Sequence, residues 1–129
     1  MPKSKEPDIT VITDGEDIHY NLVNGNVIEL FTQEKIIIYS PYSSVKYFQS
    51  APQQSTLVFS RFVIDTGITV DLEQSIALLI ASPTLIGRDL LMMNTYLQGQ
   101  TKVEVSVFNI CSYNVELEQN LHIASLIIL

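Results

Sequence analysis

The sequence predicts one all-β domain, a sandwich or barrel of about ten short strands with one short helix. Its 129 residues suit a single domain, and a hydrophobic content of 47% is typical of a globular protein. Apolar residues recur mainly at every second position, which is the period of strands, and turn residues separate the runs. We expect residues 1–8 to form a flexible arm and residues 9–129 the domain.

The strands follow one another as alternating or β-branched runs that end at turn residues. Asn24-Gly25 lies between two such runs and is the strongest short signal for a hairpin. Residues 51–55 predict a turn, and Pro41 ends a β-branched run. The expected strands are residues 9–13, 18–23, 27–31, 35–40, 44–50, 56–64, 68–72, 75–81, 101–109, 113–117 and 121–129.

One segment, residues 82–94, breaks the period of two. Ser82 is suited to cap a helix, and Pro83 is favoured at the first helical position. Gly87 weakens any longer helix. The segment therefore predicts a short helix or turn.

Composition excludes several classes of function. The net charge is −7, and the chain has only seven Lys and Arg residues. It therefore lacks the cationic surface that nucleic acids require, and strong triphosphate binding is disfavoured. Cys111 cannot form an internal disulfide, and with His19 and His122 it makes no metal signature, so we expect no metal and no cofactor. The N-terminus resembles no signal peptide, and no apolar run is long enough to span a membrane, so we expect an intracellular protein of the cytoplasm or nucleus.

The stretch "IDTGITVDLEQSIALLIASPTL", residues 64–85, resembles the second-motif region of the trimeric dUTPases. That family reads Val-Pro-Thr-Gly, then an apolar strand, a turn, a second strand and Pro-Arg-Ser-Gly-Leu. Residues 64–67 and Leu85 correspond to its ends, and "NLHIASLII" (120–128) resembles the family's Gly-Asp-Arg-Ile-Ala-Gln-Leu-Ile strand. The resemblance covers residues 64–129, and residues 27–63 loosely, and implies a dUTPase-like distorted jelly roll or β-barrel.

The sequence departs from the family where the family has its chemistry. Residues 81–84, Ala-Ser-Pro-Thr, replace the Arg and Ser that hold the phosphates, and Pro83 has no N–H to offer. The hairpin 94–100 contains no carboxylate to orient the attacking water. We therefore expect no catalytic residue and no metal site, but only the remnant of a nucleotide site at Ser82, Thr84, Tyr96, Gln98 and Gly99.

An acidic segment, residues 14–17, also resembles a sequence of the family. With Ile18 it gives "GEDI", which is similar to the family's Ala-Gly-X-Asp-Leu motif. It lies far upstream of Thr66-Gly67, so we interpret it as a charged turn.

The resemblance and the missing clamp predict a catalytically inactive relative that works through protein contacts. Among viruses, adenoviruses carry dUTPase relatives of this kind, so host proteins are the expected partners. Two alternatives remain open: a dUTP nucleotidohydrolase with an atypical site, and a structural β-domain such as a capsid or fibre component.

Two regions are candidates for protein contacts. Tyr42, Tyr47 and Phe48 flank a turn, where aromatic side chains favour interfaces, although ordinary strand packing also explains them. Ile127 and Leu129 could belong to a hydrophobic PDZ ligand, but a final strand explains the C-terminal run better.

We expect a homotrimer. The resemblance implies one, and the strands 35–40 and 121–129 are apolar on both faces. A single domain leaves one such face uncovered unless another surface packs on it.

Overall fold

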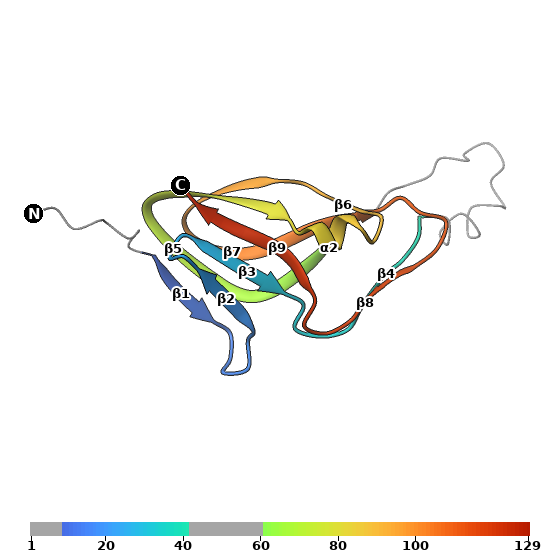
Figure 1. Ribbon diagram of the computed structural model, residues 1–129, viewed down its shortest axis with the longest axis horizontal. Helices are drawn as coiled ribbons and strands as arrows, with labels where there is room; N and C mark the ends of the chain where they lie inside the picture. Colours follow the sequence, from blue (N-terminus) through green and yellow to red (C-terminus); the bar gives the residue numbers. More distant parts are fainter. Residues whose placement is uncertain (1–8, 42–60) are drawn as a thin grey trace, which may run out of the picture.

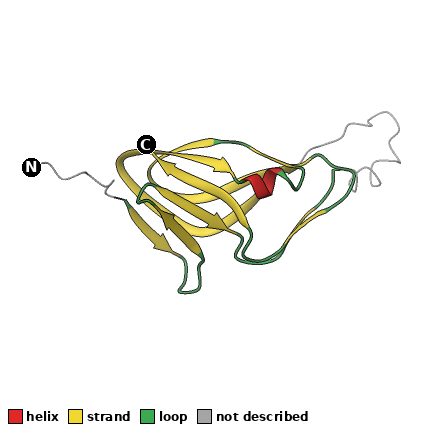
Figure 2. Ribbon diagram, viewed as in Figure 1, coloured by secondary structure: helices red, strands yellow, loops and turns green. Residues whose placement is uncertain are grey.

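The computed structural model describes residues 9–41 and 61–129. The expected arm (1–8), the strand 44–50, the turn 51–55 and the start of strand 56–64 lie outside the described residues. The regular secondary structure of the described chain is strand, apart from one helical turn, drawn red in Figure 2. No helix in the described part of the chain is both long and apolar enough to cross a membrane.

The first four strands occur where the period of two predicted them. Asn24 (φ 56°) and Gly25 (φ 74°) both adopt the left-handed backbone that an Asn-Gly hairpin turn requires. Val23 pairs with Val27 across this turn, so the predicted hairpin is confirmed. The strands are β1 (Thr10–Thr13), β2 (Tyr20–Val23), β3 (Val27–Phe31) and β4 (Ile36–Ile38).

The next strand differs from its prediction. The three short strands expected over residues 56–81 are one long strand, β5 (Arg61–Ala81), paired with β7 (Thr95–Asn109). The turn signals between them are bulges, at which Gly67 (φ 76°) and Glu73 (φ 53°) turn left-handed while the pairing with β7 resumes beyond each one. Gly99 (φ 66°) lies opposite the second bulge, and the two strands bend together there (Figure 1).

The remaining elements complete a seven-stranded sheet of order β2-β3-β9-β5-β7-β6, with β1 added to β5, and a two-stranded sheet of β4 and β8. The last strand of the chain lies between β3 and β5, near the middle of the larger sheet (Figure 1). These elements are α2 (Pro83–Ile86), β6 (Leu90–Met92), β8 (Val115–Leu117) and β9 (His122–Ile128).

The core lies inside the curl of the larger sheet. On β7 the predicted alternation is confirmed, because Val103, Val105 and Val107 are fully buried while Lys102 and Glu104 are exposed. Each buried side chain of this size contributes about 1.5–3 kcal/mol relative to exposure. The same enclosed layer includes Ile28, Leu30, Ile64, Ile68, Val70, Leu79, Ile123 and Leu126.

The opposite side of the sheet carries a group of apolar residues next to the polar pair Glu29 and Ser125. We call this group the outer face: Val27, Ile76, Leu78, Ile80 and Ile127, which alternate with buried residues on β3, β5 and β9 and remain partly accessible. The prediction that residues 121–129 are apolar on both faces holds only toward the C-terminal end, where Ile127 lies outward, because Ser125 occupies the same side of β9. Strand β4 is apolar on both faces as predicted, with Ile38 buried on one face and Ile37 exposed on the other.

Candidate functional site

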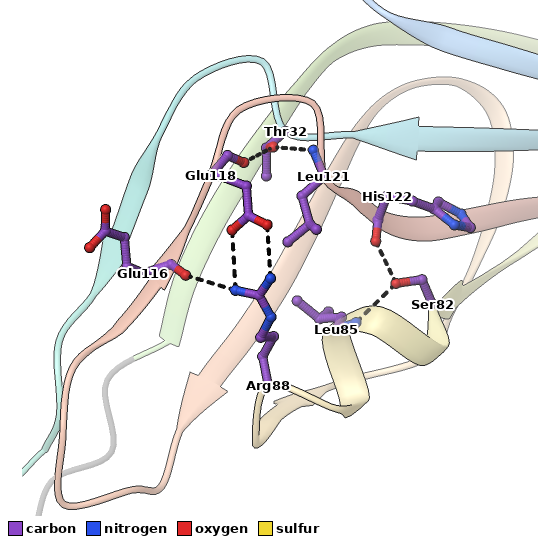
Figure 3. Close-up of polar contacts among 8 residues, drawn as sticks. All are labelled: Thr32, Ser82, Leu85, Arg88, Glu116, Glu118, Leu121 and His122. Carbon is purple, nitrogen blue, oxygen red and sulfur yellow. Dashed lines mark hydrogen bonds and ion pairs between the residues drawn. The ribbon is translucent and has the colours of Figure 1, made fainter.

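Ser82 lies at the junction between β5 and α2 and is buried, with 1% of its surface exposed. It caps the helix as predicted: its Oγ accepts a hydrogen bond from Leu85 N (3.1 Å). The same hydroxyl donates to the carbonyl oxygen of His122 on β9 (2.6 Å; Figure 3). The Ser82 hydroxyl therefore both donates and accepts a hydrogen bond within the fold.

The helix is shorter than the predicted segment. It spans Pro83–Ile86, with Thr84 exposed on it, and Asp89 then takes a left-handed φ of 62°. Residues 90–92 leave the helix because they pair with the end of β7. The predicted helix start is thus correct, and long-range pairing decides where the helix ends.

Arg88, in the turn after α2, is held by a carboxylate. Its Nη2 lies 2.8 Å from Glu118 Oε1, its Nη1 lies 3.2 Å from Glu118 Oε2, and Nη1 also donates to the Glu116 carbonyl (3.2 Å; Figure 3). Hydrogen bonding to Glu118 raises the pKa of Arg88, and the same contact lowers the pKa of Glu118. Arg88, the basic residue that follows residues 81–84 most closely in the sequence, is therefore already paired with a carboxylate.

Thr32 holds the connection between β8 and β9 in place. Its Oγ1 donates to the Glu118 carbonyl (2.6 Å) and accepts from Leu121 N (2.9 Å), as Figure 3 shows. Together with the Arg88 pair, these bonds fasten the connection between β8 and β9 to the end of β3 and to the turn after α2.

Two other basic side chains of the described residues are paired as well. Lys35 Nζ lies 2.6 Å from Glu116 Oε1, and Lys102 Nζ lies 2.8 Å from Asp65 Oδ2. The described residues contain one more basic side chain, the exposed Arg61. Within the described ranges, no cluster of cations is thus assembled to hold a polyphosphate.

The expected hairpin over residues 94–100 is wrong, because residues 95–100 lie within the single strand β7 and pair with β5 on both sides of Gly99. Gln98 and Gly99 line a shallow hollow of about 430 Å³ at the bend of β5 and β7, which we call the bend hollow, together with residues 73–76. Ile76 pairs with Gln98, and Ser82 lies six residues further along the chain, which corresponds to about 20 Å of strand. A single chain therefore does not bring the two halves of the predicted remnant together.

Tyr96, the remaining residue of that remnant, is 67% exposed and pairs with Leu78 beside the outer face. Its ring is thus available for contact, but it lies apart from Ser82 and Thr84, since the strand register places it opposite Leu78.

The candidate interaction residues are distributed differently. Tyr42, Tyr47 and Phe48 lie outside the described residues. Ile127 pairs with both Val27 and Leu78 inside the sheet, and Leu129 N donates to Ile76 O (2.8 Å) while its side chain stays exposed. The backbone of the last strand is therefore engaged in the fold.

Thr66 and Gly67 form a corner within β5 that is held by hydrogen bonds from two other segments. The buried Thr66 Oγ1 donates to Val103 O (2.7 Å), and Gly67 N donates to Asp65 Oδ1 (2.8 Å). Asp14 N donates to Gly67 O (2.8 Å), and Ile18 packs over the glycine. The acidic segment 14–17 thus lies beside Thr66-Gly67, and its distance in sequence is not a distance in space.

This corner opens into a hollow of about 370 Å³, which we call the corner pocket. Asp14, Glu34 and Asp65 bring carboxylates to it, and Lys102 Nζ lies 2.8 Å from Asp65 and 3.9 Å from Asp14. Desolvation raises the pKa of Asp65, but hydrogen bonds from Lys102 and from Gly67 N outweigh it, so the pKa lies below its ordinary value. The sequence alone does not reveal this pocket, because its carboxylates come from three separate segments.

The described residues contain no group of three His, Cys, Asp or Glu side chains placed to hold a metal ion. Cys111 is half-buried in the turn after β7, with its Sγ 3.5 Å from the Asp89 carbonyl oxygen.

Known proteins match this chain in fold but not in sequence. No known protein family matches the sequence. No curated protein matches it either. Several solved structures are similar to it in fold. A mutant dUTPase from phage phi11 of S. aureus, described in connection with a structural Mg(II) ion, has a TM-score of 0.68 at 12% identity over 94% of this chain and 89% of that one.

Two further dUTPases agree. The Staphylococcus bacteriophage 80alpha dUTPase with dUPNHPP gives a TM-score of 0.67 at 12% identity, over 94% of this chain and 81% of that one. The native EIAV dUTPase gives 0.64 at 16% identity, over 94% and 87%. The curled antiparallel sheet with one helical turn thus defines an all-β protein of the predicted class. Its particular fold is that of the dUTPases.

Proposed function

We propose that this protein acts by binding other proteins and does not hydrolyse nucleotides. One observation carries the proposal: at the positions that resemble the phosphate clamp, Ser82 is buried as a helix cap bonded to His122 and Leu85. Pro83 lacks an N–H, and Thr84 carries no charge. A phosphate chain would find neither the charged fork nor the free donors that it requires.

The charges of the described residues support the same proposal. Lys35, Arg88 and Lys102 each pair with a carboxylate, and releasing any of them for a phosphate leaves that carboxylate unpaired. The bend hollow adds the carboxylate of Glu73 and no cation. A triphosphate placed in the bend hollow would therefore be repelled by the Glu73 carboxylate.

Exposed apolar surface favours protein contacts. The edge strand β6 and the end of β7 form an apolar hollow of about 550 Å³, lined by Leu91, Met92, Met93, Phe108 and Ile110. Leu91 is 53% exposed and Met93 60% exposed. Exposed apolar patches of this kind mark interaction sites, and methionine adapts to different partners.

The outer face supports self-association. Val27, Leu78 and Ile127 form one continuous row across β3, β9 and β5, because the register pairs each with the next. Covering such a row with a second copy removes apolar surface from water. We propose a homotrimer assembled through this face, acting inside a host cell on host proteins in the manner of the non-catalytic viral dUTPase relatives.

Incubation of the purified protein with dUTP and Mg²⁺ tests the proposal, with a catalytic dUTPase as the positive control. We expect no pyrophosphate release above the protein-free rate. Saturable release that scales with protein concentration would overturn the proposal and favour the alternative, a dUTP nucleotidohydrolase with an atypical site. Assembly into large shells, seen by sedimentation, would favour a structural capsid or fibre component instead.

A further inference from the structure

We propose that the corner pocket binds the side chain of an arginine on a partner protein. This inference names the chemistry of the partner and rests on the proposed protein-binding function. The pocket lies apart from the residues that resemble a nucleotide site, at the junction of β1, β5 and the segment before β4.

The pocket combines apolar walls with an acidic rim. Ile18, Ile36 and Phe62 contribute half-buried apolar surface, and the volume of about 370 Å³ falls in the range of ligand pockets. The methylene chain of an arginine packs on such surface while its charged end stays near water. The Phe62 ring also offers a partner for a planar cation.

The charge of the rim selects a cation. Asp14, Glu34 and Asp65 supply three carboxylates, and Lys102 supplies one ammonium group, so the rim carries a net charge of −2 at neutral pH. Glu34 takes part in no ion pair within the described residues. Arginine suits this rim better than lysine because its guanidinium is more weakly hydrated and reaches two carboxylates at once.

The rim is fixed before any partner arrives. Asp14 N donates to Gly67 O, and Gly67 N donates to Asp65 Oδ1, both at 2.8 Å. The Gln33 side chain accepts from His19 N (2.9 Å) and donates to His19 O (3.0 Å), which holds the segment carrying Glu34 against the end of the first loop. Binding therefore costs little ordering of the backbone.

The test uses the ¹⁵N-labelled full chain and two acetylated, amidated peptides, Gly-Gly-Arg-Gly-Gly and the same peptide with citrulline in place of arginine. Citrulline keeps the shape of the side chain and removes its charge. We expect the arginine peptide to shift the amide signals of Asp14, Ile18, Glu34 and Gly67 and to leave that of Gly99 in place. The citrulline peptide should bind about tenfold more weakly.

Charge variants locate the site. Asp14→Asn and Glu34→Gln should each weaken the arginine peptide about threefold to tenfold. Neither removes a contact of the fold with Gly67, because Asp14 reaches Gly67 through its backbone. Glu73→Gln, in the bend hollow, is the matched control and should leave the affinity unchanged.

Three outcomes would overturn the inference: no shift at the corner, equal binding of the citrulline peptide, or equal weakening by Glu73→Gln. Equal affinity for a lysine peptide would overturn the choice of arginine. Hydrolysis of dUTP would instead overturn the proposed function, whatever the peptides do. A protein that leaves dUTP intact and ignores the arginine peptide loses this inference alone.

Discussion

Arg88 and Glu118 form a two-bonded ion pair, with Nη2 to Oε1 at 2.8 Å and Nη1 to Oε2 at 3.2 Å. The two residues are 30 positions apart, so the pair joins the turn after α2 to the segment after β8. It also pairs with a carboxylate the guanidinium that follows residues 81–84 most closely in the sequence. The ion pair thus holds these two segments together, and it leaves the Arg88 guanidinium already paired.

The first prediction concerns the pKa of Glu118. The hydrogen bond from Arg88 lowers this pKa below the ordinary value of 4.5. Arg88→Gln should return the pKa toward that value, because the charged donor is lost. An NMR titration of the Glu118 side-chain carbon measures it, and an unchanged pKa in the variant would show that the pair does not persist in solution.

The second prediction concerns the helix cap. Ser82→Ala removes the bond to Leu85 N and the bond to His122 O, and should lower the free energy of unfolding by about 1–2 kcal/mol. Urea denaturation measures the loss. Thr84→Ala, exposed on the same helix, is the matched control and should change the free energy by less than about 0.5 kcal/mol. Equal effects of the two substitutions would contradict the structural role of Ser82.

The third prediction compares two glycines with similar left-handed backbones. A Cβ at Gly67 would lie 2.6 Å from Ile18 Cδ1, whereas a Cβ at Gly99 meets nothing within 4 Å. Gly99→Ala should therefore cost only the backbone term of about 1–2 kcal/mol, and Gly67→Ala should cost more. Thermal or urea unfolding ranks them.

Ile18→Val tests the cause of that difference. It removes Cδ1, so the extra cost of Gly67→Ala should shrink in the double variant. An additive double variant would mean that Ile18 is not the atom group in the way.

The fourth prediction concerns pH. Asp65 has a pKa below its ordinary 3.8, so its contribution to stability is present above pH 3.8 and is lost as the pH falls through the pKa in the folded state. Lys102 has a pKa above its ordinary 10.5, so its contribution is present below pH 10.5 and is lost as the pH rises through the folded value.

Lys102→Met isolates this pair. The difference in urea midpoint between the natural chain and the variant should be constant from pH 5 to pH 9 and should shrink below pH 3.8 and above pH 10.5. High salt should reduce it throughout, because both side chains are about half exposed. A difference that does not vary with pH would rule out the ion pair as its source.

The fifth prediction concerns self-association. Ile76→Lys places a charge on the exposed end of the outer face and should shift the sedimentation coefficient from trimer toward monomer. Ile86→Lys, at an exposed position on α2 that is not one of the outer-face residues, should leave the assembly intact. Circular dichroism should be unchanged in both. A natural chain that sediments as a monomer at micromolar concentration would refute the homotrimer.

Local features were predictable from sequence because neighbouring residues decide them. The Asn24-Gly25 hairpin, the cap at Ser82 followed by Pro83, and the buried valines of β7 all depend on backbone preference or on the period of two. The resemblance over residues 64–129 also gave the fold, and the solved dUTPase structures confirm it.

Only the tertiary structure decided which turn signals are turns. Thr66-Gly67 reads as the end of a strand, yet β7 continues to pair on both sides of it, so the residues form a bulge within β5. The same long pairing separates Gly99 from Ser82 along β5 and thus divides the predicted nucleotide remnant. Strand register depends on contacts between distant segments, and no local preference encodes it.

The sequence by itself therefore determined the β class, the Asn24-Gly25 hairpin, the Ser82 cap and the absence of Arg from residues 81–84, since each depends on residue type and near neighbours. The tertiary structure decided that Asp14, Glu34 and Asp65 share one pocket and that Glu118 holds Arg88. The physical reason is that charges interact through space, and the folded chain brings together residues that lie tens of positions apart.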